Sequence, residues 1–213
     1  MLLQEQVFVY EWFAGCMKRH SESDFLAWAQ KRGLELDPRY PDSAVLTLAP
    51  NPQFDRFWTV PLQPERRPYF LQCMLGAFGT WSSYRCWRHL GSWPAKPDER
   101  RINDQIEHAI FRGIGLPEGS ADIIEFDASE RVQLVTLLFA TTVFGWSVGQ
   151  DIFLVPDTAR GTLQTDHHGV IHASFKEEAS MNAFIQRMEE EEFPLPDDVP
   201  DATFKIPKWM RNS

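Results

Sequence analysis

The stretch DIFLVPDTARGTLQTDHHGVIHASFKEEASMNAFIQRM, residues 151–188, decides the fold because its local structure can be predicted from residue pattern alone. Short apolar runs alternate here with PDTARG and HHG, which are typical of turns. The stretch therefore predicts three strands, DIFLV (151–155), TLQTD (162–166) and VIHASF (170–175), followed by a helix over 177–188.

The second turn determines which residues of its two strands face each other. Directly opposed residues of an antiparallel pair share a face, and a one-residue slip exchanges the two faces. A two-residue loop would put polar Gln164 opposite apolar Ile171, whereas a three-residue loop ending at Gly169 keeps each face consistent. Gly169 then takes the left-handed position of the loop, which glycine adopts without a steric penalty. This register predicts the pairs Leu163 with Ala173, Thr165 with Ile171, Gln164 with His172, and Asp166 with Val170.

One face of these strands is mostly apolar, and we expect the following helix to pack on it. The polar residues of the other face are Gln164, Asp166, His172 and Ser174. The apolar residues of the helix are Met181, Phe184, Ile185 and Met188. Their i, i+3, i+4, i+7 spacing is typical of a helix packed on a sheet.

The remainder of the chain predicts both helices and strands. Two strands, 44–49 and 54–60, are separated by a short NPQ turn and predict a hairpin. The pairs Ser21 with Asp24 and Asp127 with Glu130 have the spacing of helix capping boxes. The predicted helices are 3–17, 22–32, 68–78, 98–110 and 131–144, and a further strand is predicted at 121–126. The helix 131–144 is apolar on most sides, so we expect it to be buried.

These elements predict an α+β fold in which a mainly antiparallel sheet, with β-hairpins near its C-terminal end, packs against several helices. A chain of 213 residues with 43% hydrophobic residues is long enough to bury a full core. We expect one α+β domain over residues 1–213, in which 189–213 form an acidic, proline-rich C-terminal tail.

The composition bears on the cellular compartment of the protein and on whether its cysteines bind zinc. No apolar run reaches the roughly 18 residues needed to span a bilayer, and residues 1–15 contain Glu5 and Glu11 where a signal peptide would be basic and then apolar. We therefore expect a cytoplasmic protein. Cys16, Cys73 and Cys86 lack the paired spacing of a zinc site and are interpreted as reduced thiols, and no cofactor is predicted.

The net charge of −9 argues against nucleic-acid binding, which depends on Lys and Arg neutralising phosphates. The charge is unevenly distributed, because residues 188–204 contain seven acidic residues and no Lys or Arg. Either this segment is a solvated helix end and tail, or it is a contact surface for a basic partner.

A second unusual stretch is GTWSSYRCWRHLGSWP, residues 79–94, which combines four large aromatic residues with two arginines. Trp, Tyr and Arg dominate the binding energy of protein interfaces, so the stretch could form a recognition surface. It could equally form a stacked core with cation–π contacts. The residues that bear most on this choice are Trp81 and Trp87.

The turn DHHGVIH, residues 166–172, contains the residue types that bind transition metals. The possible ligands are Asp166, His168 and His172, with His167 beside them. Only Asp166 and His172 share a face in the predicted register, and a structural metal site needs four ligands. A polar turn that exposes histidines, either to a partner or without a binding role, therefore fits the pattern better than a metal site.

The organisation of the C-terminal third, GWSVGQDIFLVPD, then TDHHGVIHASF, a helix and an acidic proline-rich segment, resembles bacterial immunity proteins of polymorphic and type VI secretion toxin systems. The resemblance implies a protein that binds and blocks a cognate toxin without catalysis. A basic toxin would suit the acidic surface. The alternative is a small metal-dependent or hydrolytic enzyme centred on Asp166, His168 and His172. The partner-binding residues expected for the first hypothesis are Trp81, Trp87, His167, His168, Glu190, Glu191, Asp197 and Asp198.

Overall fold

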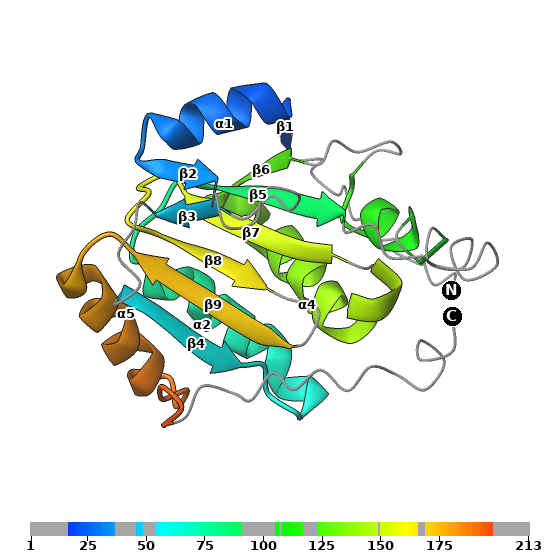
Figure 1. The fold of residues 1–213 in the computed structure, drawn as a ribbon. Helices are drawn as coiled ribbons and strands as arrows, with labels where there is room; N and C mark the ends of the chain where they lie inside the picture. The colour runs from blue at the N-terminus through cyan, green and yellow to red at the C-terminus, as the bar shows by residue number, and fades with distance from the viewer. Residues whose placement is uncertain are drawn as a thin grey trace, which may run out of the picture.

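The protein has an α+β fold, established by a computed structural model in which helices pack on a twisted antiparallel sheet (Figure 1). This confirms the fold class predicted from the sequence. The structure describes residues 17–36, 46–48, 54–90, 105–106, 108–116, 123–148, 150–165 and 169–197.

The main sheet has seven strands in the order β1-β6-β5-β7-β8-β9-β4, and every neighbouring pair is antiparallel. In this order the strands are Lys18–His20, Ile123–Asp127, Ser83–Leu90, Gln150–Pro156, Gly161–Thr165, Val170–Phe175 and Asp55–Thr59. A separate pair joins β2 (Leu34–Leu36) to β3 (Leu46–Leu48).

The β7-β8-β9 meander and the helix after it, α5 (Glu178–Glu190), agree with the sequence prediction. Leu163 pairs with Ala173 and Gln164 with His172, as the three-residue loop requires. Gly169 has φ +78°, so it holds the predicted left-handed conformation. The predicted pair of Asp166 with Val170 lies outside the described residues.

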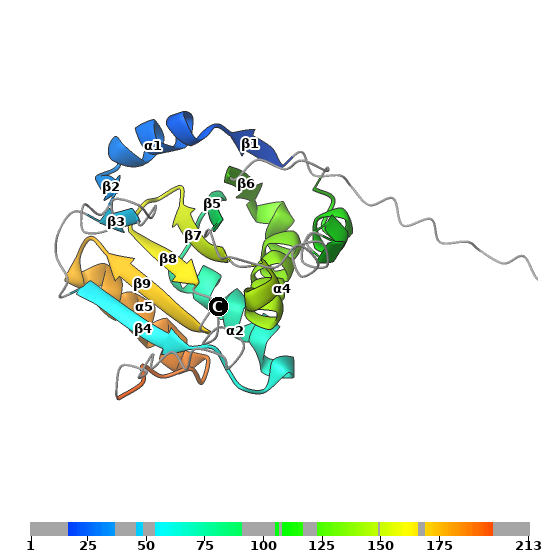
Figure 2. The ribbon, with the colours of Figure 1, turned by 45° about the vertical axis from the view of Figure 1, so that its right-hand side comes forward.

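Among the described residues, α2 (Arg67–Ala77), α4 (Arg131–Val148) and α5 lie on one face of the sheet (Figure 2). α2 lies between α4 and α5, and it contacts both. The buried residues of α5, Met181, Phe184 and Met188, join the main core beneath the strands. The predicted seat of this helix is therefore confirmed.

The opposite face is partly covered by α1 (Glu22–Gln30). Phe25 of α1 lies in a second core with Trp87 and Phe153 of the sheet. The helix begins where the side chain of Ser21 accepts a hydrogen bond from the Asp24 backbone N–H at 3.1 Å, as a helix N-cap does. The corresponding start of α4 has a full capping box between Asp127 and Glu130.

The predicted hairpin of 44–49 with 54–60 is wrong. β3 pairs with β2, and β4 pairs with β9 at the edge of the main sheet. The physical reason is burial, since Trp58 of β4 lies opposite Ile171 and packs on Phe184 at 5.4 Å between ring centroids.

Three strands were not predicted, and they are β1, β2 and β5. β5 lies inside the sheet between β6 and β7, although Arg85 and Arg88 interrupt its apolar pattern. The guanidinium of Arg88 stacks on Phe111 at 4.3 Å, and that of Arg85 stacks on Trp28 at 4.1 Å. Cation–π contacts thus let a central strand accommodate charged residues.

Several sequence predictions concern segments that are described only in part. The predicted helix 3–17 lies outside the described residues except for Met17, which packs against the main core. Of the predicted helix 98–110, residues 105–106 and 108–110 are helical, and the helix continues to 113. No helix among the described residues is long and apolar enough to cross a membrane.

Candidate protein-binding surface

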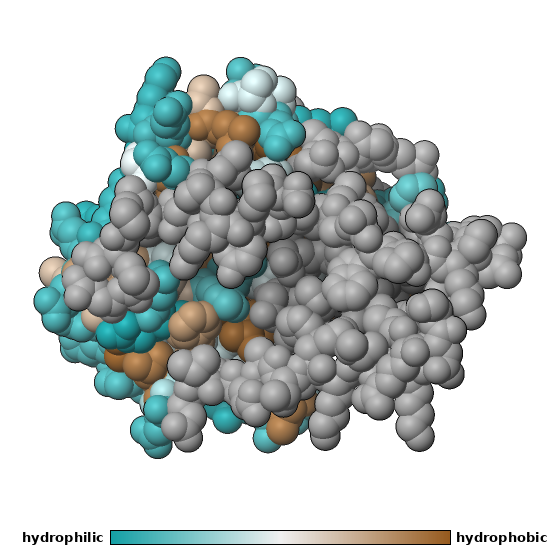
Figure 3. Space-filling view, in the orientation of Figure 1, coloured by the Kyte–Doolittle hydropathy of each residue, from teal (hydrophilic) through white to brown (hydrophobic). Residues whose placement is uncertain are grey.

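The end of α5 and the segment after it carry a dense group of exposed carboxylates. Hydrophilic residues cover much of the left edge of the molecule, where α5 lies (Figure 3). An exposed tyrosine of α2 lies beside this group. We call the whole surface the acidic corner, and its members are Tyr69, Glu189, Glu190, Glu191, Glu192 and Asp197. Asp198, also predicted to bind a partner, lies outside the described residues.

The acidic corner is built on a defined helix end. The backbone N–H of Phe193 donates to the Met188 carbonyl at 2.8 Å, and that of Glu192 donates to the Glu189 carbonyl at 3.0 Å. Together these bonds form a Schellman motif, which requires a left-handed residue after the helix. Glu192 occupies that position with φ +65°, where glycine is the usual residue.

Phe193 fixes the segment after α5 to the body of the protein. Its ring is 7% exposed and packs on Phe70 at 5.1 Å between centroids. The indole Nε1 of Trp58 donates to the Phe193 carbonyl at 3.3 Å, and the Arg66 guanidinium lies 5.0 Å from the ring centre. The start of the predicted C-terminal tail is therefore packed against the core. The later residues 198–213 lie outside the described part of the chain.

The aromatic ring of Tyr69 lies beside the Glu191 carboxylate. Its side chain is 52% exposed, and its hydroxyl donates to the Glu191 carboxylate. The hydrogen bond to Glu191, together with neighbouring Cys73, raises the pKa of Tyr69 to about 12, so the phenol stays protonated at neutral pH. An exposed tyrosine bordered by charged groups has the composition of an interface anchor with a polar rim. Sequence reasoning missed Tyr69, because nothing local distinguishes it from buried Phe70.

The described part of the aromatic stretch, residues 79–90, exposes less aromatic surface than the recognition hypothesis requires, and residues 91–94 lie outside the described part of the chain. Trp87 is 3% exposed and packs on Phe25 and Phe153, so it belongs to the second core. Trp81 is half-buried and meets Tyr84 edge to face at 4.5 Å. Because Trp87 is buried, it is part of the core and cannot be an exposed anchor for a partner.

The predicted histidine turn is described only at its far end. His172 is half-buried and meets Phe57 edge to face at 4.5 Å, and Gln164 lies opposite it in the sheet. Asp166, His167 and His168 lie outside the described residues. Among the residues that the structure describes, no three His, Cys, Asp or Glu side chains gather to hold a metal ion.

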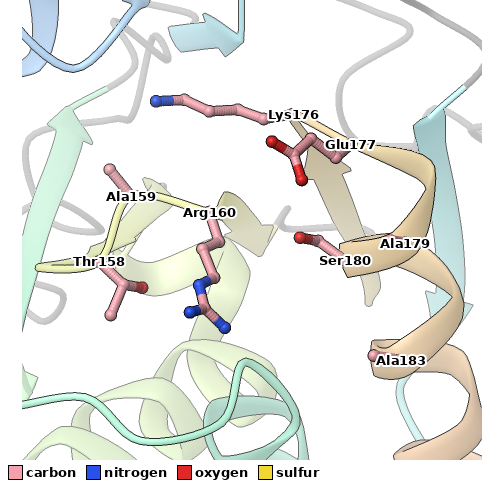
Figure 4. Close-up of a pocket in the computed structure, with 8 residues that line it drawn as sticks. All are labelled: Thr158, Ala159, Arg160, Lys176, Glu177, Ala179, Ser180 and Ala183. Atoms are coloured by element: carbon pink, nitrogen blue, oxygen red, sulfur yellow. The ribbon is translucent and has the colours of Figure 1, made fainter.

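A polar cleft of about 540 Å³ opens between the β7–β8 turn and the first turns of α5 (Figure 4). Arg160 projects from the turn, and Glu177 and Ser180 line the opposite wall. The ammonium group of Lys176 extends away and donates to the Arg32 carbonyl. Lys176 therefore does not approach Ser180 as a base, and we interpret the cleft as a polar groove.

A half-buried ion-pair cluster lies on the sheet face beneath α1. Glu125 accepts hydrogen bonds from His20 Nε2 at 2.8 Å and from Arg85 Nε at 3.1 Å. Burial alone would raise the pKa of Glu125, but these hydrogen bonds and the charges of His20 and Arg85 outweigh it and lower the pKa. Arg85 also stacks on Trp28, so the cluster joins β1, β5 and β6 to α1. Its position indicates a structural role.

The two described cysteines are poorly suited to nucleophilic catalysis. Cys86 is fully buried, and burial raises the pKa of its thiol to about 12. Burial also raises the pKa of the Cys73 thiol. Since the thiolate is the nucleophile, both residues are largely unreactive at neutral pH.

Comparison with known proteins gives no match to any family model, curated protein or solved structure. The function must therefore be inferred from the geometry and charge of this chain.

Proposed function

We propose that this protein is an inhibitory binding protein that neutralises a cognate basic protein toxin, as bacterial immunity proteins do. The observation that supports the proposal most is the acidic corner, in which a run of exposed carboxylates ends α5 and the Glu191 carboxylate accepts a hydrogen bond from the half-exposed Tyr69. The proposal includes a cytoplasmic location and an origin in a polymorphic or type VI secretion toxin system.

The two components of the acidic corner have different roles in this proposal. The carboxylates attract a basic partner over long distances and accelerate encounter. The ring of Tyr69 supplies apolar contact area at the centre, where loss of a contact acts mainly on dissociation. Phe193 and the helix end hold both components in place, so little conformational entropy is lost on binding.

The test is co-purification with the product of the neighbouring gene, followed by binding kinetics at two salt concentrations. Glu190→Gln with Glu191→Gln should slow association and flatten its salt dependence. Glu177→Gln with Glu178→Gln is the matched control, because it removes two exposed acids from the other end of α5.

A third variant, Tyr69→Ala, should speed dissociation by roughly tenfold for each 1.4 kcal/mol of binding energy lost. Equal effects of the two glutamate pairs would show that only net charge matters and that the acidic corner is not the contact. Failure of the adjacent gene product to bind, together with small-molecule turnover that His172→Ala abolishes, would contradict the proposal and favour the enzyme hypothesis.

A further inference from the structure

Three basic side chains converge on one carboxylate at the β1 edge of the sheet. Lys18, Glu125 and Arg85 are directly opposed on the neighbouring strands β1, β6 and β5. His20 lies two residues after Lys18, so its side chain is on the same face of the sheet and reaches Glu125 diagonally. The distances to the Glu125 carboxylate are 2.8 Å from His20 Nε2, 3.1 Å from Arg85 Nε and 3.8 Å from Lys18 Nζ.

The three basic side chains differ in how strongly they bind Glu125. The side chains of His20 and Arg85 are 19% and 16% exposed, whereas that of Lys18 is 72% exposed. Water therefore screens the Lys18 charge, and its contact contributes little. His20 and Arg85 also donate hydrogen bonds, which are stronger to an ionised carboxylate than to a neutral group. Of the two residues of β1 that contact Glu125, His20 thus makes the stronger contact.

β1 depends on this contact because it is a short strand at the edge of the sheet. It has three residues, and among the described strands it pairs with β6 alone. The residue before it, Met17, packs against the main core, so the strand is held at that end. At its other end His20 directly precedes Ser21, the N-cap of α1. The His20 contact therefore holds the end of β1 at which α1 begins.

Histidine is the side chain whose charge changes nearest to neutral pH, between about pH 5 and 8. Burial would raise the pKa of Glu125, but the hydrogen bonds and charges of His20 and Arg85 lower it, so the carboxylate is ionised throughout this range. A protonated His20 donates a charge-assisted hydrogen bond to Glu125. A neutral imidazole can still donate through Nε2, but the ionic attraction is lost.

Arg85 limits the effect of this loss. An arginine guanidinium keeps its charge at every pH at which proteins are ordinarily folded. Arg85 donates to Glu125 from β5 and stacks on Trp28 of α1. Glu125 is therefore still paired when His20 is neutral, and the contact between β5 and β6 is retained. The loss should weaken β1 and the start of α1 and leave the inner strands unchanged.

We propose that the protonation of His20 controls how firmly β1 and the start of α1 are held on the sheet. Protonated His20 binds β1 to Glu125, and deprotonation lets β1 open more often while the inner strands keep their pairing. This inference does not depend on the toxin-binding function.

The other charged groups around β1 leave one rival source of pH dependence. Lysine, arginine and exposed carboxyl groups titrate outside the range of histidine. Burial raises the pKa of Glu130, which feels the charges of Lys18 and Glu125, so Glu130 is the rival. The remaining described groups are Lys18 on β1, Arg85 on β5, Asp127 at the end of β6, and Glu22 and Asp24 in the first turn of α1.

The test is amide hydrogen exchange of the full chain from about pH 5 to about pH 8, expressed as protection factors so that the intrinsic pH dependence of exchange is removed. Protection of the β1 amides should fall roughly two- to fivefold as pH rises, the range for a weak ion pair, while β7 and β8 stay constant. His20→Gln keeps a hydrogen-bond donor without a titratable ring, so its β1 protection should be low and independent of pH. The matched control is His108→Gln, which replaces an exposed histidine of another helix and should behave like the wild type.

Glu125→Gln tests the same contact through the sign of the effect. Without the carboxylate, a protonated His20 would face Arg85 and Lys18 with no negative charge between them. Protection of β1 in this variant should therefore rise with pH. Each variant decides by itself, so the failure of one to fold leaves the other as the test.

Three results would overturn the proposal. The first is wild-type β1 protection that does not change with pH. The second is a His20→Gln variant that keeps the pH dependence, since Glu130 or another group would then be its source. The third is an equal loss of protection in β1 and β7, because the pH effect would then be on global unfolding.

Discussion

The strained end of α5 gives the sharpest test of how the acidic corner is built. Glu192 is exposed, has φ +65°, and lies in the left-handed position of the Schellman motif. A left-handed backbone costs a non-glycine residue roughly 1 to 2 kcal/mol. Glycine avoids this strain but loses more backbone entropy on folding, by about 0.5 to 1 kcal/mol. Glu192→Gly should therefore stabilise the protein by about 0.75 kcal/mol, the middle of a range from about 0 to about 1.5 kcal/mol.

The control is Glu192→Ala, which removes the same charge but retains the strained backbone. Urea denaturation should place the midpoint of Glu192→Gly above that of Glu192→Ala, with equal slopes, because the substitutions do not change the surface exposed on unfolding. In a chain of this length the gain corresponds to an increase in melting temperature of about 2 °C. Equal midpoints for the two variants would refute the argument that backbone strain is stored at this helix end.

Three further predictions concern Gly161, Gly169 and Glu125. Gly161→Ala should destabilise by about 1 to 3 kcal/mol through steric collision, since its Cβ would lie 2.5 Å from the Ser174 carbonyl oxygen. Gly169→Val should lower the free energy of unfolding by roughly 1 to 2 kcal/mol through backbone strain alone, because no atom lies within 4 Å of the position of an added Cβ. Gly169→Ala should lower it by as much in urea denaturation. A Gly169→Ala variant as stable as the wild type would contradict this. The Glu125 carboxyl has a pKa below its ordinary value of 4.5, so its stabilisation is present above pH 4.5 and is lost as pH falls through the lowered pKa. Glu125→Gln should therefore be less stable than wild type at neutral pH, with a deficit that shrinks below pH 4.5, and a deficit that stays constant with pH would exclude this mechanism.

The sequence predicted the C-terminal meander because its information is local. The alternation along β8 and β9, with Gly169 in the turn, left one register that kept each face uniform, and the structure has that register. The apolar spacing of α5 fixed the side of the helix that faces the sheet. The acids at the end of α5 could also be identified from the sequence, since seven acidic residues without a basic one make a composition signal.

The sequence could not identify the neighbours of elements that pair over long distances. β4 pairs with β9, more than a hundred residues away, because Trp58 needs the core beneath Ile171. β5 is an inner strand although Arg88 is 3% exposed, because Phe111 from another segment lies against the guanidinium. The local sequence pattern shows whether a residue is polar. It does not show which distant residue will contact that polar side chain and stabilise it when it is buried.

Periodicity, turn chemistry and charge thus determined by sequence alone the β7-β8-β9-α5 unit, the capping of α1 and α4, and the acidic segment. Only the tertiary structure decided that Tyr69 is exposed beside Glu191, that Trp87 is buried, and that Val132 and Val143 of α4 are exposed. The physical reason is that exposure depends on which elements pack on a given face. Apolar spacing gives the direction in which an element prefers to bury its side chains, while the number of neighbours available to cover them follows from the assembled fold.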